Sequence, residues 1–91
     1  MIYRPVYTNQ FQKDAKRCQR RGKDLEKFKI LACTLLDGKR PDAIHRDHKL
    51  AGNLVGRRDC HIESDWVLVY RIEGDRLVFE RMGTHSDLFK K

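Results

Sequence analysis

Residues 56–66 read Gly-Arg-Arg-Asp-Cys-His-Ile-Glu-Ser-Asp-Trp, and the apolar run Val67–Tyr70 follows directly. Apolar and polar residues alternate over residues 54–62, and the apolar run extends into Trp66–Ile72, so each segment is typical of a strand. Glu63-Ser64-Asp65, between these segments, consists of residue types that favour a turn. The stretch therefore predicts two antiparallel strands with polar side chains gathered at their turn.

Further strands are expected on both sides of this pair. Glu73-Gly74-Asp75 predicts a second turn, and residues 77–82 continue the meander as a third strand. Near the N-terminus, Ile2–Tyr7 alternates and is rich in residues that favour strands, and Pro5 argues for a sheet edge. The expected sheet is small, twisted and mainly antiparallel.

Two helices are predicted between the N-terminal strand and the meander. The segments Thr8–Gly22 and Asp24–Gly38 carry apolar residues three or four positions apart, which gives each helix one apolar stripe. Thr8 can cap the first helix, and Asp24 can cap the second unless Lys23 opens it. We expect an α+β fold in which this helix hairpin packs on one face of the sheet, as a single domain over residues 1–91.

Positive charge is concentrated in the first half of the chain. Residues 1–50 hold 13 Lys and Arg against 6 Asp and Glu, a balance of +7, whereas residues 51–91 hold 7 of each. Such a one-sided charge suggests a polyanionic partner, and a solvated helix surface is the alternative. The helix cations predicted to face solvent and to dock on such a partner are Lys13, Lys16, Arg17, Arg20 and Arg21.

The sequence also predicts where the protein works. No apolar run approaches the roughly 20 residues of a membrane span, and the N-terminus has no apolar signal segment. Cys18, Cys33 and Cys60 show no C-x-x-C spacing, so they are expected to be reduced thiols. We therefore predict a cytoplasmic protein with no membrane partner.

Polar chemistry is predicted on one face of the sheet. Side chains at alternate positions from Arg57 to Glu63, including Asp59 and His61, share one face of their strand. That face is too polar to be the core. The helices are therefore expected to cover the opposite face and leave a polar concavity here.

Three histidines can converge on this concavity. His61 lies near its rim with Asp65, His48 enters from the loop before the meander, and His85 enters from the segment after the third strand. Adjacent strands of a meander bring these segments close together, although scattered surface histidines are the alternative. His45 has no neighbours that suggest chemistry, and we interpret it as a surface histidine.

Two chemistries fit three histidines and a carboxylate. Such a set can bind zinc, but the surrounding Arg and Lys disfavour a dication. The other is metal-free RNA cleavage, in which a 2′-hydroxyl attacks the adjacent phosphate, histidines carry the protons, and cations stabilise the developing charge. An aromatic ring can stack on a base. The residues that supply this set are His48, Lys49, His61, Asp65, Arg81, His85 and Phe89.

Three motifs give the chain a resemblance to a known family. They are Asp47-His48-x-Leu50, then Gly56-x-Arg58-Asp59-x-His61-x-Glu63-x-Asp65-Trp66, and finally Phe79-Glu80-Arg81-x-Gly83-Thr84-His85 with Leu88-Phe89 behind it. Nearly the whole chain resembles the YafQ group of the RelE/ParE toxin superfamily. The members of that group are ribosome-dependent mRNA interferases of bacterial type II toxin-antitoxin modules.

The resemblance implies a RelE-like microbial RNase fold and an endoribonuclease that needs no cofactor or metal. It implies His48, His61, Asp65 and His85 as the catalytic set. We favour His48 and His85 as proton carriers and His61 with Asp65 as orienting groups, and the reverse assignment stays open. The candidates for substrate binding are Lys49, Arg58, Trp66, Arg81 and Phe89.

The resemblance also implies partners. They are mRNA on the ribosome and a DinJ-like antitoxin, which blocks the toxin and, in complex with it, binds operator DNA. ParE-like relatives share the fold but act on DNA gyrase without cutting RNA, so a pure interaction protein is the rival hypothesis. Such a protein has no need of three convergent histidines, and a non-catalytic RNA-binding domain would need a stacking pair that the strands lack.

Overall fold

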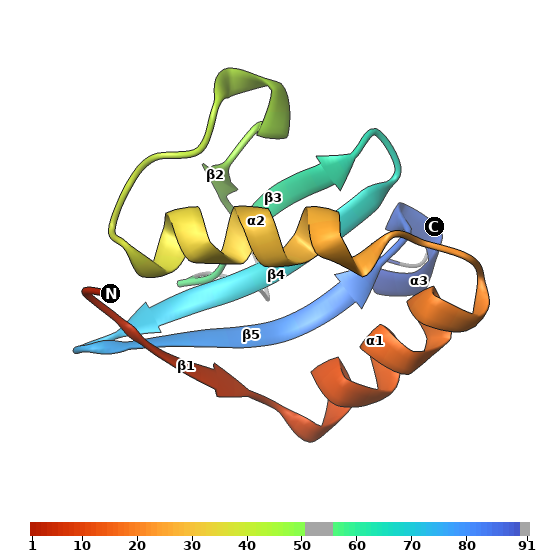
Figure 1. Cartoon of the computed structure of the whole chain (residues 1–91), viewed down its shortest axis with the longest axis horizontal. Coiled ribbons are helices and arrows are strands. Elements are labelled where there is room, and N and C mark those ends of the chain that lie inside the picture. Colours follow the sequence, from red (N-terminus) through yellow and green to blue (C-terminus); the bar gives the residue numbers. More distant parts are fainter. Residues whose placement is uncertain (51–55, 90–91) are drawn as a thin grey trace.

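A computed structural model describes residues 1–50 and 56–89. The elements, in chain order, are β1 (Arg4–Tyr7), α1 (Asn9–Arg20), α2 (Leu25–Leu36), the 3₁₀ helix η1 (Ala43–His45), β2 (His48–Lys49), β3 (Arg58–Glu63), β4 (Trp66–Glu73), β5 (Arg76–Gly83) and α3 (His85–Phe89). The strands form one sheet in the order β1-β5-β4-β3-β2 (Figure 1). This is the α+β fold that the sequence predicts.

The sheet is mainly antiparallel, with one exception at its edge. β2 with β3, β3 with β4 and β4 with β5 are antiparallel pairs, whereas β1 runs parallel to β5. The predicted meander is confirmed, since β3, β4 and β5 follow one another through turns at residues 64–65 and 74–75. Of the strand predicted over residues 54–62, Leu54 and Val55 lie outside the described residues, and β3 begins at Arg58.

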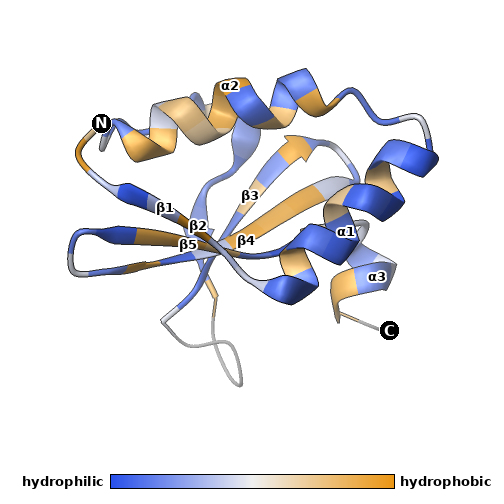
Figure 2. Cartoon of the chain, turned by 60° about the horizontal axis from the view of Figure 1, so that its bottom comes forward, coloured by the Kyte–Doolittle hydropathy of each residue, from blue (hydrophilic) through white to orange (hydrophobic). Residues whose placement is uncertain are grey.

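The core lies between the sheet and the two long helices. Trp66, Leu68 and Tyr70 of β4 alternate toward the helices together with Leu77 and Phe79 of β5, and none is more than 2% exposed. α2 lies across the sheet over β3 and β4, and α1 runs beside β5 (Figures 1 and 2). Within residues 1–50 and 56–89, no long helix covers the opposite face of the sheet, which leaves that face open for a site.

Both predicted helix caps are confirmed. The Thr8 hydroxyl accepts a hydrogen bond from the Phe11 N–H at 2.9 Å, and the Asp24 carboxylate accepts one from the Glu26 N–H at 3.0 Å. These bonds satisfy N–H groups that have no partner within the helix. α1 and α2 have 12 residues each, and no helix among the described residues has the length and apolar character of a membrane span.

α1 also closes the edge of β5 beyond the end of β1. β1 pairs with β5 only from Arg76 to Phe79. Farther along, the buried Asp14 carboxylate accepts hydrogen bonds from the Met82 N–H at 3.1 Å and from the Arg81 Nε–H at 2.8 Å. A strand edge left open would present unpaired backbone groups, so a helix side chain here replaces the missing strand.

Three short elements lie where the sequence predicts loops. η1 and β2 fall within residues 38–53, and β2 exists because His48 pairs with Asp59 and Lys49 with Arg58. α3 follows β5 and has five residues. Elements this short are stable only through contacts with the rest of the fold, and they carry little periodic signal in the sequence.

Candidate active site

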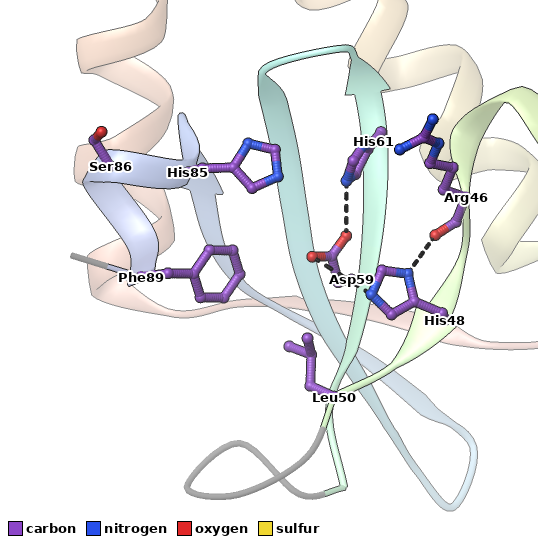
Figure 3. A pocket seen from close by; sticks show the side chains of 8 residues that line it. All are labelled: Arg46, His48, Leu50, Asp59, His61, His85, Ser86 and Phe89. Carbon is purple, nitrogen blue, oxygen red and sulfur yellow. Dashed lines mark hydrogen bonds and ion pairs between the residues drawn. The ribbon is translucent and has the colours of Figure 1, made fainter. Parts of the chain in front are cut away.

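A cavity of about 570 Å³ opens on the sheet face opposite the helices (Figure 3). It is lined by Arg46, His48, Leu50, Asp59, His61, His85, Ser86 and Phe89. Asp59 and His61 reach the cavity because they alternate along β3 with Cys60 and Ile62, which point into the core. The fold therefore brings together segments around β2, β3 and α3, and with them three of the four histidines.

Asp59 lies between two of these histidines. Its carboxylate is buried, with Oδ1 at 3.4 Å from the Nε2 atom of His61 and Oδ2 at 4.0 Å from the Nε2 atom of His48 (Figure 3). Burial raises the pKa of Asp59, and the charges of the neighbouring histidines oppose this effect. The carboxylate thus couples the protonation of the two imidazole rings.

His48 is oriented by its own loop. Its Nδ1 atom lies 2.6 Å from the backbone carbonyl oxygen of Arg46. A carbonyl oxygen can only accept a hydrogen bond, so the proton of the neutral ring lies on Nδ1. The Nε2 atom, which faces Asp59 and the cavity, is then free to take up a proton.

His85 is held by Asp65, which lies in the turn before β4. Both the backbone N–H and the Nδ1 atom of His85 donate to the same Asp65 oxygen, at 3.0 and 2.6 Å. The backbone hydrogen bond first, and the ring second, lower the pKa of Asp65 below its ordinary value. The His85 ring lies 5.1 Å from the ring of His61 and 6.0 Å from that of Phe89, between centroids. Its Nε2 atom remains available to exchange a proton.

His61 differs from the other two histidines because it is largely buried. Burial lowers the pKa of His61, Asp59 opposes this, and positive charge on His85 and Arg46 lowers it further. The ring is therefore neutral at neutral pH. Its backbone carbonyl accepts a hydrogen bond from the Nδ1 atom of His45 at 2.7 Å. His45, interpreted from the sequence as a surface histidine, thus ties η1 to β3.

Arg46 is the cavity residue that sequence reasoning missed most clearly. Among residues 1–50 and 56–89, it is the one Arg or Lys that lines the cavity. Its backbone has a φ of 48°, in the left-handed region, which costs a residue with a side chain about 1–2 kcal/mol. A sequence pattern cannot reveal such a conformation. The signal that was available is its place two residues before His48.

Four residues predicted to bind substrate do not line the cavity. Trp66 is 1% exposed and belongs to the core. The Arg58 Nε–H donates to Asp47 at 3.0 Å on the helix side of the sheet, and Arg81 donates to Asp14 in α1. Lys49 is exposed on β2 and lies beside a different, smaller hollow. Phe89, the fifth candidate, does line the cavity.

The helix cations predicted to dock on RNA divide into two groups. Arg17 and Arg21 point toward α3, where both form ion pairs with Asp87. Lys13, Lys16 and Arg20 are exposed on α1 and form no ion pair with other described residues. Only the second group forms the free basic surface that the charge balance suggests. Sequence spacing could not separate the groups, because Asp87 belongs to the other end of the chain.

Cofactor-binding features are few. Within the described residues, no three His, Cys, Asp or Glu side chains are grouped so that they could hold a metal ion. All three cysteines are free thiols, and Cys18 and Cys60 are buried. Burial raises the pKa of Cys60 to about 12, so this thiol is a structural residue of the core and a poor nucleophile.

Comparison with known proteins identifies relatives over the full length. The model of the family described as "Bacterial toxin of type II toxin-antitoxin system, YafQ" matches residues 3–90. The mRNA interferase toxin YafQ of Escherichia coli (strain K12) is 44% identical over 91 residues, which cover 98% of this chain and 99% of that protein. Identity at this level over the whole length implies the same fold and family.

Solved structures agree with this relation. A chain in the crystal structure of the E. coli DinJ-YafQ toxin-antitoxin complex is 41% identical, with a TM-score of 0.89 over 98% of this chain and 99% of that one. A metal-bound toxin from Helicobacter pylori is 32% identical, with a TM-score of 0.90 over 98% of this chain and 100% of that one. The chain therefore belongs to the YafQ family of bacterial toxins of type II toxin-antitoxin systems.

Proposed function

We propose that this toxin is an mRNA interferase, an endoribonuclease that uses histidines and carboxylates without a metal. One observation carries the proposal. The hydrogen bonds of His48 and His85 occupy Nδ1 in both rings, so both Nε2 atoms are left to exchange protons at one cavity. The mRNA interferase name of the E. coli relative supports the same substrate class.

The proposed reaction transfers two protons. A 2′-hydroxyl attacks the adjacent phosphorus, the bond to the 5′-oxygen breaks, and a cyclic phosphate and a 5′-hydroxyl form. One of His48 and His85 accepts the proton of the 2′-hydroxyl, and the other donates a proton to the 5′-oxygen. Asp65 orients His85 and stabilises its protonated form. His61, neutral because of its lowered pKa, orients the site and donates to the phosphate.

Charge stabilisation is assigned to Arg46. Its exposed side chain lines the cavity wall, and its positive charge is one of the causes that lower the pKa of His61, as expected of a cation near that ring. The guanidinium can therefore reach a phosphate bound between the histidines. Arg58 and Arg81, in contrast, donate to the carboxylates of Asp47 and of the buried Asp14, respectively, and act through the fold. Phe89 presents its ring at the opposite wall, where it can stack on a base next to the cleaved bond (Figure 3).

The proposal includes the ribosome as the place of cleavage. The basic surface of Lys13, Lys16 and Arg20 lies on α1, outside the cavity, which suits a substrate presented within a larger RNA body. We further propose a DinJ-like antitoxin as the inhibitory partner, in a complex that binds operator DNA, because the DinJ-YafQ complex contains a close structural relative. Both roles place the protein in the cytoplasm, without a membrane partner.

The decisive experiment adds the purified protein to translating ribosomes and maps the new mRNA ends. Cleavage with 5′-hydroxyl ends, unchanged by a chelator selective for transition metals, is the expected result. Loss of cleavage in the chelator, restored by one added metal, would replace the metal-free mechanism with a metal-dependent one. Intact mRNA together with inhibition of DNA gyrase would instead support the ParE-like alternative.

A further inference from the structure

The helix α3 carries three residues that line the cavity, His85, Ser86 and Phe89, but it is too short to be stable without contacts to the rest of the fold. It spans five residues, with His85 at its start and Phe89 at its end. An isolated helix of this length is unstable in water, since the cost of its first turn is not recovered. The orientation of both rings must therefore come from contacts that α3 makes with other elements.

Asp87 is the residue through which α1 holds α3. Its Oδ2 atom lies 2.7 Å from the Nη1 atom of Arg21 and 3.6 Å from the Nη2 atom of Arg17. The hydrogen bond from Arg21 is the largest cause of a strongly lowered pKa at Asp87. The carboxylate is therefore charged throughout the range in which the protein functions, and both ion pairs persist.

The same carboxylate also fixes the start of α3. The Thr84 N–H donates to Asp87 at 3.0 Å, and the Asp87 N–H donates to the Thr84 hydroxyl at 3.1 Å, which is a capping box. A side chain at Gly83 would collide with Arg17 and Asp87, since its Cβ would lie 2.9 Å from an atom of each. This close approach leaves α3 little freedom to rotate.

Arg17 extends the connection into the interior. Its Nη2 atom donates to the buried Asp14 carboxylate at 3.1 Å and to the Met82 carbonyl at 3.4 Å. Arg17 thus joins α1, the end of β5 and α3 in one network. On the other side of α3, Asp65 holds the backbone and ring of His85. α3 is therefore fixed from two directions.

We propose that Arg17, Arg21 and Asp87 form a positioning clamp that sets the placement of His85 and Phe89 for RNA cleavage. The three residues, called the Asp87 clamp below, do not line the cavity and act through α3. This inference rests on the proposed function. It also removes Arg17 and Arg21 from the surface assigned to RNA docking, because their guanidinium groups are engaged within the fold.

The test compares Arg21→Ala with a matched control, Arg4→Ala. Both changes remove one positive charge and one exposed Arg–Asp ion pair, since Arg4 lies 3.3 Å from Asp75 at the far end of β1. Single-turnover cleavage at saturating ribosomes and ribosome affinity are measured for each. Arg21→Ala is expected to slow cleavage about 10- to 100-fold with unchanged affinity, because displacing a reacting group by about 1 Å can cost that much. Arg4→Ala is expected to match the parent.

Two further variants sharpen the test. Arg21→Lys keeps a cation within reach of Asp87 and is expected to cleave faster than Arg21→Ala. Asp87→Asn keeps an oxygen that can accept from the Thr84 N–H but removes the charge that binds the two arginines, so its cleavage rate is expected to fall. The His85 ring is followed by NMR in the same proteins. Its signals are expected to shift and broaden in Arg21→Ala and Asp87→Asn, and to match the parent in Arg4→Ala. Parent-like cleavage in Arg21→Ala, or weaker ribosome binding at an unchanged rate, would overturn the clamp.

The NMR measurement separates the two proposals. A parent protein that cuts no RNA would refute the proposed function, yet displacement of the His85 ring in Arg21→Ala would still support the clamp. A cutting parent with an unmoved His85 ring in Arg21→Ala would refute the clamp alone. Melting temperatures confirm folding in each variant, and an exposed side chain such as that of Arg21 contributes little to them.

Discussion

At the scale of a single residue, the buried carboxylate of Asp59 in the cavity lowers the stability of the fold. Burial raises the pKa of its carboxyl group, so the folded protein resists an ionisation that the unfolded chain accepts above pH 3.8. The unfolded chain therefore binds fewer protons than the folded protein as the pH rises above that value. By linkage, this group makes the fold less stable with rising pH, until the folded carboxyl group has also ionised.

We therefore predict that Asp59→Asn makes the protein more stable at pH 7 and less active. Asparagine has the same shape and no charge to bury, but it cannot couple the protons of His48 and His61. Urea titrations of parent and variant should show the gain at pH 7. The gain should vanish well below pH 3.8, where the carboxyl group is protonated in both states. A variant less stable than the parent at pH 7 would contradict this account.

His85 and His48 can be distinguished by the leaving group of the substrate. His85→Ala should lower cleavage about 10²- to 10⁴-fold, the usual contribution of a positioned acid or base, with little loss of stability. An RNA with sulfur in place of the 5′-bridging oxygen needs no acid to expel it. If His85 is the acid, this RNA should restore cleavage by His85→Ala but not by His48→Ala. Rescue of His48→Ala alone would reverse the roles, and rescue of neither variant would remove both from the acid step.

At the scale of elements, the edge of β5 depends on a charge inside the fold. The Asp14 side chain is 0% exposed and bonds to Arg17, Arg81 and the Met82 N–H. Removing the Asp14 carboxylate leaves the buried Met82 N–H without its acceptor and takes an ion-pair partner from Arg81 and Arg17. Hydrogen bonds and ion pairs of Asp14 therefore stabilise the end of β5, where β1 no longer pairs with it.

Asp14→Ala is accordingly predicted to cost about 1–3 kcal/mol of unfolding free energy, measured by urea denaturation. Asp42→Ala is the control, because Asp42 is exposed and its side chain makes no capping bond. The control should change stability by no more than about 0.5 kcal/mol. Equal stability of the two variants would show that Asp14 does not hold the edge of β5.

The elements that the sequence predicts well are those with local signals. The apolar run after Asp65 and the turn at Glu73-Gly74-Asp75 give β4 and β5 to within a residue or two. Thr8 and Asp24 reveal the helix starts because a cap acts within one turn. β2 carries no such signal. The capping box of Thr84 and Asp87 is a local signal for the start of α3 that the sequence reasoning missed. The partners of Arg58 and Arg81 are 11 and 67 positions away, so their structural roles could not be inferred from neighbouring residues.

At the scale of the whole molecule, part of the excess positive charge is engaged in ion pairs within the fold. Of the five helix cations predicted to dock, two face Asp87 and three face solvent. The convergence of three histidines was foreseen from the meander, whereas Arg46 and the buried position of Asp59 follow from tertiary structure alone. The composition gives the net charge, but the tertiary structure determines how many of the charged side chains are exposed and available to bind another molecule.

The free basic surface leads to a prediction about ionic strength. Lys16→Glu combined with Arg20→Glu should weaken ribosome association and flatten its salt dependence. Each lost phosphate contact should lower the log–log slope by roughly one unit. Binding measured across a salt series gives the slope, and single-turnover cleavage by the complex that still forms should change little. Identical slopes for parent and variant would assign these residues to solubility alone.

The parallel pairing of β1 with β5 has a consequence for how the toxin is made. A chain leaves the ribosome N-terminus first, so β1 emerges long before the strand beside which it must lie. The sheet cannot close, and α3 cannot dock on α1, until residues up to His85 and beyond have been synthesised. The nascent chain therefore lacks the assembled site until its last described elements, β5 and α3, have emerged. The order of synthesis thus makes α3, the last described element of the chain, the one that completes the cavity.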